Sequence, residues 1–420
     1  MLQKYKLRDL INVTRGASLP GEYYSETGEY IRLTMGNFNY NGNGFKENTS
    51  KNDIYYTGPI REEYILNKGD IITPLTEQAI GLLGTTAMIP ESGKYIQSQD
   101  VALIKCKEDK LDHLFCYYLI SSDIVKKQLS AAAQQTKIRH TSPEKIMDCT
   151  VWIPEITIQQ KIGKALYDID QKIILNKIIN AELEAMAKQL YDYWFVQFDF
   201  PNENGKPYKS SGGKMVYNPT LKREIPVGWE IKGLGDLLSF SNGINYEKGI
   251  EGDKLYRIIN VRNITSSSIY INKADLDEIL LPSKVADNFL INNDDIIIAR
   301  SGTPGSTRLI DMPENILYCG FIIKGKPVDF IYKYYVMFFL KQLEGTQATK
   351  TGGSILQNVS QDTLKSLNIV VPSECFIYSF NEKIDSYFSM LNKKLDEINY
   401  LTHLRDSLLP MLMNGQVTLV

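Results

Sequence analysis

The stretch EIPVGWEIKGLGDLLSF, residues 224–240, has the character of a chain beginning, although it lies at mid-chain. A turn containing proline and glycine leads into an amphipathic start, and the segment YKLRDLINV, residues 5–13, has the same frame. Leu7 in residues 5–13 corresponds to Leu234 in residues 224–240, an offset of 227 residues (234 − 7). A long offset shared by separate segments is the sign of an internal duplication.

Two further blocks support this duplication. NKGDIITPLTE (67–77) matches NNDDIIIARSG (292–302), and SPEKIMDCTVWIPE (142–155) matches SQDTLKSLNIVVPSE (360–374). Their offsets are 225 (292 − 67) and 218 (360 − 142), as expected when small loop insertions separate homologous elements. The chain therefore predicts two copies of one structural unit.

Each copy begins with a mixed region of short β-branched runs separated by Gly, Asn and Pro, which is typical of strands and loops. The runs are YIRLTM, DIIT and YIQSQDVALIKC in the first copy, and LYRIINV, DDIIIAR and CGFIIKG in the second. The segments HLFCYYLISSDI and IYKYYVMFFLKQL each predict an amphipathic helix with an aromatic face. The expected fold of each region is an α/β domain with much loop.

Each copy ends in a long segment that has helical spacing of apolar residues. Residues 155–192 contain no proline, and residues 373–409 repeat the pattern. A helix of this length extends roughly 57 Å and is marginal alone, so we expect the two apolar seams to pair antiparallel. Asn176 and Asn180 lie near the first seam. They either set the helix register or face solvent.

The long helices are predicted to stop at Pro201 and at Pro410 with Gly415. The fold class is therefore α/β, with two similar recognition-type domains in pseudo-symmetric tandem, separated by two long antiparallel coiled-coil-like helices. The predicted parts are a first domain (1–151), a first spacer helix (152–200), a linker (201–226), a second domain (227–372), and a second spacer helix with a tail (373–420).

Composition excludes several function classes. The 47 basic and 49 acidic residues nearly cancel, so net charge gives no sign of a nucleic-acid partner. Five scattered cysteines and three histidines favour neither a zinc cluster nor a disulfide framework. We expect a cytoplasmic protein with no membrane span, because the most apolar run, YYVMFFL, is too short to cross a bilayer. No phosphate-binding GxxxxGK[ST] loop and no Asn-Pro-Pro-aromatic motif occurs, so an enzyme is disfavoured.

The chain resembles the specificity (S) subunit of type I DNA restriction-modification systems over essentially its whole length. The resemblance lies in LYDYWFVQFDFP and LLPMLMNGQV at the helix ends, and in GDII and ARSGTPGS within the domains. The first copy departs from the pattern, because TPLTEQAIGLLG replaces the Arg-Ser-Gly loop.

This resemblance implies a non-catalytic subunit that directs a complex to an asymmetric, bipartite site on double-stranded DNA. Each domain would be a target recognition domain reading one half-site, and the helix pair would fix the spacing and dock two methyltransferase (M) subunits. The restriction (R) subunits would join them, with S-adenosylmethionine and ATP/Mg bound in the partners and no cofactor in this chain. The alternatives are a fused DNA methyltransferase or nuclease, and a coiled-coil adaptor without a DNA role.

Candidate DNA-binding residues lie on loops next to strands and in basic windows, where Arg, Lys, Gln and Thr can reach phosphates or base edges. In the first copy they are Arg15, Gln78, Thr85, Thr86, Gln135, Lys137 and Arg139; in the second they are Arg262, Arg300, Ser301, Thr303, Arg308, Lys350, Ser354, Gln357 and Asn358. Arg300 or Arg308 can address guanine O6 and N7. The alternative is an ordinary turn whose arginine pairs with a carboxylate.

A dense aromatic cluster closes the first long helix. Its predicted partner-binding members are Tyr191, Tyr193, Trp194 and Phe195. The alternative is that these rings pack where the helix meets its own domain.

Overall fold

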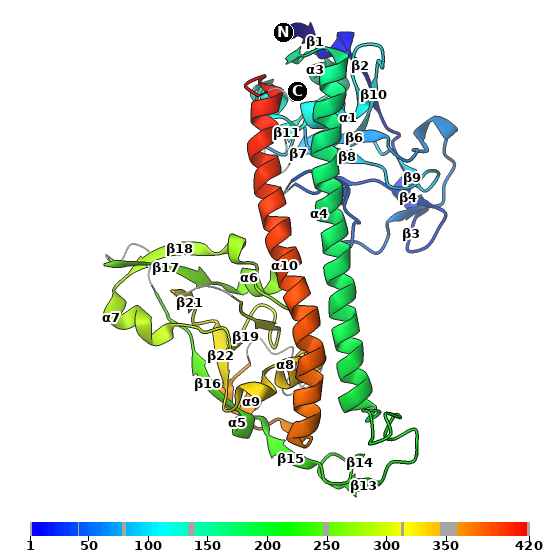
Figure 1. Ribbon diagram of the computed structural model, residues 1–420. Coiled ribbons are helices and arrows are strands. Elements are labelled where there is room, and N and C mark those ends of the chain that lie inside the picture. The colour runs from blue at the N-terminus through cyan, green and yellow to red at the C-terminus, as the bar shows by residue number, and fades with distance from the viewer. Residues whose placement is uncertain are drawn as a thin grey trace. The chain divides into compact units, whose positions relative to one another are not determined.

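The computed structural model describes residues 2–40, 42–77, 81–132, 139–246, 252–311, 315–344 and 359–417. The chain divides into two compact units, which Figure 1 shows in ribbon form. Unit 1 contains Met1–Ile174 together with Tyr400–Val420, and unit 2 contains Leu175–Asn399. The last part of the chain therefore belongs to the unit that the N-terminus begins.

Unit 1 is built on two four-stranded sheets. The first has the order β2 (Ile11–Arg15), β10 (Val101–Cys106), β6 (Ile71–Pro74), β8 (Ala87–Met88) and is antiparallel throughout. The second has the order β3 (Tyr24–Ser25), β5 (Tyr55–Tyr56), β4 (Tyr30–Arg32), β9 (Tyr95–Ile96), and its last pair is parallel. Two smaller antiparallel pairs are β1 (Gln3–Lys6) with β12 (Thr150–Ile153), and β7 (Thr76–Glu77) with β11 (Arg139–His140). The helices are α1 (His113–Ile120), α2 (Asp123–Ala132) and α3 (Pro143–Met147).

Unit 2 repeats the first sheet and the parallel pair of the second, but its second sheet has three strands. Its first sheet has the order β16 (Leu238–Asn242), β22 (Ile322–Pro327), β19 (Ile296–Ala299), β20 (Thr307–Leu309). Its second has the order β18 (Asp277–Leu281), β17 (Lys254–Ile259), β21 (Ile316–Tyr318), with the last pair parallel. The smaller pairs are β15 (Glu230–Gly233) with β23 (Asn368–Val371), and β13 (Met215–Asn218) with β14 (Arg223–Pro226). The helices are α5 (Leu234–Leu237), α6 (Val261–Ser266), α7 (Ser283–Ala286), α8 (Lys333–Leu343) and α9 (Gln361–Lys365).

Short 3-10 turns complete both units. They are Leu7–Asp9, Gly21–Tyr23, Met35–Asn37 and Glu62–Tyr64 in unit 1, and Lys273–Asp275, Asp287–Phe289 and Phe330–Tyr332 in unit 2. Every strand run and both aromatic helices that the sequence predicts are present, so the α/β tandem is confirmed.

The two long helices are α4 (Ile156–Tyr191, 36 residues) and α10 (Glu374–Met413, 40 residues). In unit 1, Leu166 near the start of α4 shares a core with Leu412 at the end of α10. In unit 2, Leu183 near the end of α4 shares a core with Ile384 near the start of α10. The two helices therefore run antiparallel (Figure 1), as their apolar seams predict.

The predicted end of the second helix at Pro410 is wrong. α10 continues through Pro410 to Met413. Proline cannot donate a backbone hydrogen bond inside a helix. Leu412 and Met413 are fully buried in the core of unit 1, and this burial offsets the lost bond. Gly415 follows in the left-handed region with φ 68°, which is typical of a residue just after a helix.

Three other predicted boundaries differ from the structure. The α-helical part of α4 ends at Tyr191, and a π-helical turn at Asp192–Val196 follows it. The segment predicted as a linker, 201–226, carries the β13–β14 hairpin and lies within unit 2. The boundary expected at 151/152 falls inside β12.

Asn176 and Asn180 are buried on α4 rather than exposed to solvent. Among the described residues, neither side-chain amide has a hydrogen-bond partner. A buried polar group without a partner costs about 1–3 kcal/mol. We therefore expect the variant N176L/N180L to be more stable than the wild type by at least about 1 kcal/mol, measured as an increased urea midpoint.

The matched control for this prediction is Gln160→Leu, an exposed position on the same helix. Its effect should stay within about 0.5 kcal/mol. A clear loss of stability in N176L/N180L would contradict the prediction and would show that the two amides set the helix register.

Candidate nucleic-acid interface

In unit 1, two of the predicted loops are joined at their base. The β7–β11 pair places Arg139 opposite Glu77 and His140 opposite Thr76. The Thr141 backbone N–H donates to the Leu75 carbonyl at 2.9 Å. Gln78, Gln135 and Lys137, and the side chain of Arg139, lie outside the described structure. Their flanking residues nevertheless bring the two loops to one corner of the unit.

Unit 2 joins its equivalent loops in the same way. The Val359 N–H donates to the Arg300 carbonyl at 2.8 Å. Glu344 accepts from the Thr307 N–H at 2.7 Å. Lys350, Ser354, Gln357 and Asn358 are outside the described residues, and Glu344 and Val359 are their described neighbours along the chain. One end of this predicted loop therefore contacts the connection between β19 and β20, residues 300–306 (the Arg300 loop), and the other end contacts the start of β20.

A third loop reaches the same corner in each unit, and a glycine makes the approach possible. A Cβ added to Gly16 would lie 2.4 Å from the Gln97 carbonyl oxygen, and one added to Gly243 would lie 2.2 Å from the Cys319 carbonyl oxygen. Both distances are far below van der Waals contact, so these positions require glycine. Arg15, one residue before the first of them, donates from Nε to the Gln99 carbonyl at 2.7 Å.

Matching backbone bonds establish which residues of the two units correspond. The Leu75 N–H donates to the Asp100 carbonyl at 2.8 Å, and the Arg300 N–H donates to the Phe321 carbonyl at 2.9 Å. The carbonyls of Leu75 and Arg300 accept the equivalent bonds from Thr141 and Val359. Leu75 therefore occupies the position of Arg300. A buried leucine in one unit corresponds to a half-buried arginine in the other.

The Arg300 loop is shaped by its two glycines, as the sequence predicts. Gly302 and Gly305 have φ angles of 77° and 84°, which side chains rarely adopt. Among the described residues, the Arg300 guanidinium has no hydrogen bond or ion pair, although its backbone is bonded on both sides. Ser301 and Thr303 are also half-buried, and the Thr303 hydroxyl lies 3.3 Å from that of Thr265. The backbone of Arg300 is therefore fixed, while its guanidinium has no bonding partner among the described residues.

The prediction that Arg308 reads a base is wrong. Its side chain is 9% exposed, and it forms an ion pair with Glu344 at 2.9 Å. It also donates to the Ser267 and Thr307 carbonyls at 2.7 and 2.6 Å. Its donors stabilise the loop from inside, which is the alternative that the sequence left open.

The prediction that Thr85 and Thr86 bind DNA is also wrong. Both side chains are fully buried, and the Thr86 hydroxyl donates to the Tyr117 carbonyl at 3.0 Å. Neither threonine can contact DNA without opening the core.

Arg15 and Arg262 are both exposed, so their assignment to DNA binding stays a prediction. Arg262 pairs with Asp277 at the surface. A hydrogen bond from Ser142 lowers the pKa of Glu144, and the charge of Arg15 adds to this effect.

The aromatic cluster packs inside unit 2. Tyr191, Trp194 and Phe195 are buried, with the Phe195 ring centred 5.0 Å from Phe380. The partner-binding prediction is wrong for these three residues, because their surface is already covered. Tyr193 is exposed and stays a prediction. It lines a hollow of about 660 Å³ with Met186, Gln189 and Tyr387.

Sequence reasoning missed Arg32, which lies in a run read only as a strand. This arginine is almost fully buried, yet it lines a cavity of about 420 Å³ in unit 1. A basic residue in an alternating strand pattern gives no sign that its side chain is enclosed.

The described residues contain no cluster of three or more His, Cys, Asp or Glu side chains suited to a metal ion. In the same part of the chain, each helix is too short or too polar to cross a membrane.

Comparison with known proteins gives the family. The family described as "Type I restriction modification DNA specificity domain" matches residues 2–185 and again residues 226–400. The specificity subunit of the type I restriction enzyme MjaIX of Methanocaldococcus jannaschii is 24% identical over 318 residues, 72% of this chain and 68% of that protein. The specificity subunit of the type I restriction enzyme HindI of Haemophilus influenzae is 24% identical over 322 residues, 63% of this chain and 68% of that protein.

A solved structure has the same fold. The S subunit of a type I restriction-modification system from M. genitalium superposes with a TM-score of 0.59 at 14% identity, covering 98% of this chain and 96% of that one. The two matched regions, 2–185 and 226–400, contain the two repeated frames. This chain therefore belongs to the type I restriction-modification DNA specificity family and carries two copies of its domain in tandem.

Proposed function

We propose that this chain is the non-catalytic specificity subunit of a type I restriction-modification complex and that its two units read the two different halves of an asymmetric DNA site. One observation carries the asymmetry. The two units share the matching backbone hydrogen bonds described above but place Leu75 and Arg300 at the equivalent loop position. Arginine can form a bidentate contact with guanine, whereas leucine offers no hydrogen bond to a base. Equal frames with unequal side chains suit two different half-sites.

The partners follow from the same proposal. Double-stranded DNA, two methyltransferase subunits and the restriction subunits would assemble on this chain in the cytoplasm. S-adenosylmethionine and ATP with Mg would be bound by the partner chains. The relatives named above are specificity subunits of restriction enzymes, which supports this division of labour.

The helix pair is proposed to fix the spacing between half-sites and to dock the methyltransferase subunits. Two observations support this role. Both helices are continuous over 36 and 40 residues, so neither contains a loop that would let its length vary. The hollow beside Met186 and Tyr193 presents apolar surface that is open to a partner.

Arg300→Ala tests this function. In cells carrying the partner subunits, we expect long-read detection of methylated adenine to show an interrupted two-part motif that disappears when this gene is deleted. The Arg300→Ala variant should relax one position in one half of that motif, by about 5- to 150-fold, because a bidentate arginine contact contributes about 1–3 kcal/mol of discrimination. The other half should not change.

The control is Arg223→Ala, an exposed arginine in the β13–β14 hairpin. This variant should leave the motif intact. A motif that survives deletion of the gene would refute the function. A motif that Arg300→Ala leaves unchanged would remove Arg300 from base recognition.

A further inference from the structure

The cavity at Arg32 is formed by four segments of unit 1. These are the segment from Ala17 to Tyr24, the end of β4 with the turn that follows it, residues near Asn48, and the turn before β10. Its volume of about 420 Å³ lies in the range of small-molecule sites. The lining residues used below are Ala17, Arg32, Gly36, Lys51, Gln99 and Asp100.

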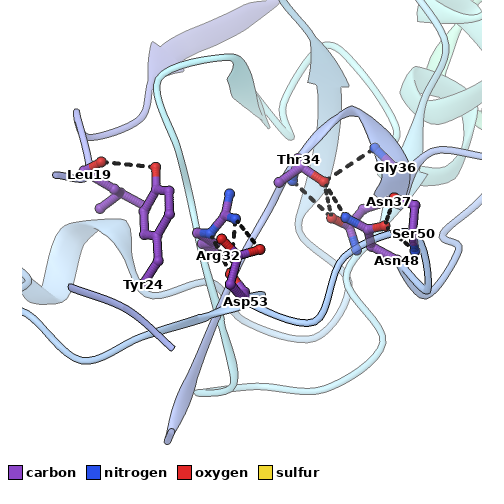
Figure 2. Close-up of polar contacts among 9 residues, drawn as sticks. All are labelled: Leu19, Tyr24, Arg32, Thr34, Gly36, Asn37, Asn48, Ser50 and Asp53. Carbon is purple, nitrogen blue, oxygen red and sulfur yellow. Dashed lines mark hydrogen bonds and ion pairs between the residues drawn. The ribbon is translucent and has the colours of Figure 1, made fainter. Parts of the chain in front are cut away.

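Arg32 is held firmly but keeps one free donor. Its Nε and Nη2 donate to the Asp53 carbonyl at 3.2 and 2.9 Å, and Nη2 lies 3.4 Å from the Asp53 carboxylate. The guanidinium carbon lies 3.8 Å from the centre of the Tyr24 ring, which is itself fixed by a bond to the Leu19 carbonyl. Figure 2 shows the third nitrogen, Nη1, without a contact. Within the described structure, Nη1 has no protein acceptor, although Arg32 is only 6% exposed.

The opposite wall is pre-formed. The Asn48 side-chain Nδ2 donates to the Thr34 hydroxyl at 2.8 Å, and the Ser50 hydroxyl donates to the Asn48 side-chain Oδ1 at 2.6 Å (Figure 2). Gly36 lies against this network, and a Cβ there would meet the Asn48 side chain at 2.7 Å. A fixed wall and a fixed arginine reduce the entropy lost when a ligand enters.

The charges around the cavity decide what kind of group it suits. Arg32 and Lys51 are opposed by Asp53, which pairs with Arg32, and by Asp100 on the cavity wall. Two positive and two negative side chains give a phosphate no net attraction. A neutral ring with both donors and acceptors needs no net electrostatic attraction, because Arg32 can donate a hydrogen bond to it and Asp100 can accept one from it. A nucleobase has this chemistry.

The cavity lies at the corner where the three loops meet. The Asp100 carbonyl accepts from Leu75, and the Gln99 carbonyl accepts from Arg15. The Thr76 hydroxyl donates to the sulfur of Met35, which lines the cavity, at 3.2 Å. The loops proposed to contact DNA therefore frame the same opening.

Unit 2 lacks the central donor. The Thr34 N–H donates to the Asn37 side chain at 2.8 Å, and the Asn260 N–H donates to the Asn263 side chain at 2.8 Å. This match aligns Thr34 with Asn260, two residues after Arg32 and Ile258 respectively. Arg32 therefore corresponds to a buried isoleucine. Unit 1, which has leucine in place of Arg300, carries its own enclosed arginine elsewhere in the same frame.

We propose that this cavity receives a nucleobase of the half-site read by unit 1, with Arg32 Nη1 donating to an acceptor of that base. The inference rests on the proposed function and adds a specificity-determining residue to it. Arg32 reads the base, Tyr24 and Asp53 hold Arg32, and Asp100 accepts from the donor edge of the base. Unit 1 has Leu75 at the position of Arg300, so in this unit the proposed arginine contact comes from Arg32 instead.

Two variants test the proposal in the complete complex. Arg32→Met removes the donor, and Ala17→Leu partly fills the cavity without replacing Arg32 or either of the residues that hold it, Tyr24 and Asp53. Each should weaken discrimination at one position of one half-site by about tenfold or more, with the other half-site unchanged, measured by long-read methylation mapping. Thermal melting reports whether each variant folds. If Arg32→Met fails to fold, Ala17→Leu alone decides.

The matched control is Arg61→Met. Arg61 is also stacked on a tyrosine of unit 1, 4.9 Å from the Tyr64 ring centre, but it is exposed and outside the cavity. The inference is overturned by an unchanged motif in a folded Ala17→Leu complex, by an equal loss of methylation at all sequences, which would indicate a phosphate contact, or by the same change in Arg61→Met. If the wild-type complex gives no two-part motif, the proposed function itself fails.

Discussion

Replacing Arg405 with methionine is expected to destabilise the protein by about 3 kcal/mol or more. Arg405 lies on α10 and donates from Nη1 to the Asp170 carboxylate on α4 at 2.8 Å. The two side chains are only 10% and 17% exposed. Removing one partner of a buried ion pair leaves the other charge uncompensated in the core, which costs about 3–5 kcal/mol. The expected readout is a lower urea midpoint.

Tyr118 is a second donor to the Asp170 carboxylate and belongs to the same buried network. Its hydroxyl donates to the second oxygen of Asp170 at 2.6 Å. Burial raises the pKa of Tyr118, and the Asp170 charge raises it further, so this hydroxyl stays a donor at neutral pH. The network joins α1, α4 and the end of α10 within unit 1. Its loss therefore weakens the attachment of the last part of the chain to the unit that the N-terminus begins.

Two further variants separate the ion pair from general damage to the helix. Asp168→Asn breaks the exposed pair with Lys164 one turn earlier in α4 and should cost no more than about 0.5 kcal/mol. The double variant D170L/R405M should recover much of the loss, because apolar side chains often replace a buried ion pair without penalty. A single variant Arg405→Met as stable as the wild type would show that this network does not hold the segment.

The sequence predicts the larger architecture because duplication and periodicity are local signals. The strand DIIT becomes β6, buried on both faces, and the aromatic run YYVMFFL lies in α8. The offsets of 227, 225 and 218 between matching blocks reappear in the structure, where Gly16 corresponds to Gly243, Leu75 to Arg300 and Thr141 to Val359. The matching blocks can be recognised in the sequence because they make the same backbone hydrogen bonds in both units.

The sequence does not predict which polar side chains are free. In the sequence, Arg300 and Arg308 look equally suited to contact a base. In the structure, Arg308 lies in β20 and forms an ion pair with Glu344 at the end of α8. That contact joins residues 36 positions apart (344 − 308), and no local pattern reports it. Arg32 shows the reverse failure, because an enclosed arginine in a strand resembles an ordinary solvent-facing one. Tertiary contacts decide both cases.

Exchanging the first domain for that of a relative should change the recognised half-site of that domain alone. Each unit has its own cores, and the described loops proposed to contact DNA are bonded only within their own unit. The exchange is best made after Pro154, since a cut at 151 would break β12 and its pairing with β1. We expect methylation mapping to show one half of the motif replaced and the other half and the spacer retained.

The graft has one demand that follows from the fold. Leu412 and Met413 of α10 pack into the core that the first domain supplies, so the donor domain must offer an apolar surface there. A graft that melts early therefore reports a mismatched core, and grafting the donor's equivalents of residues 400–417 along with its first domain should restore it. A stable graft that alters both halves of the motif would show that the two units do not read DNA independently, because a change confined to one core would then have altered contacts made by the other.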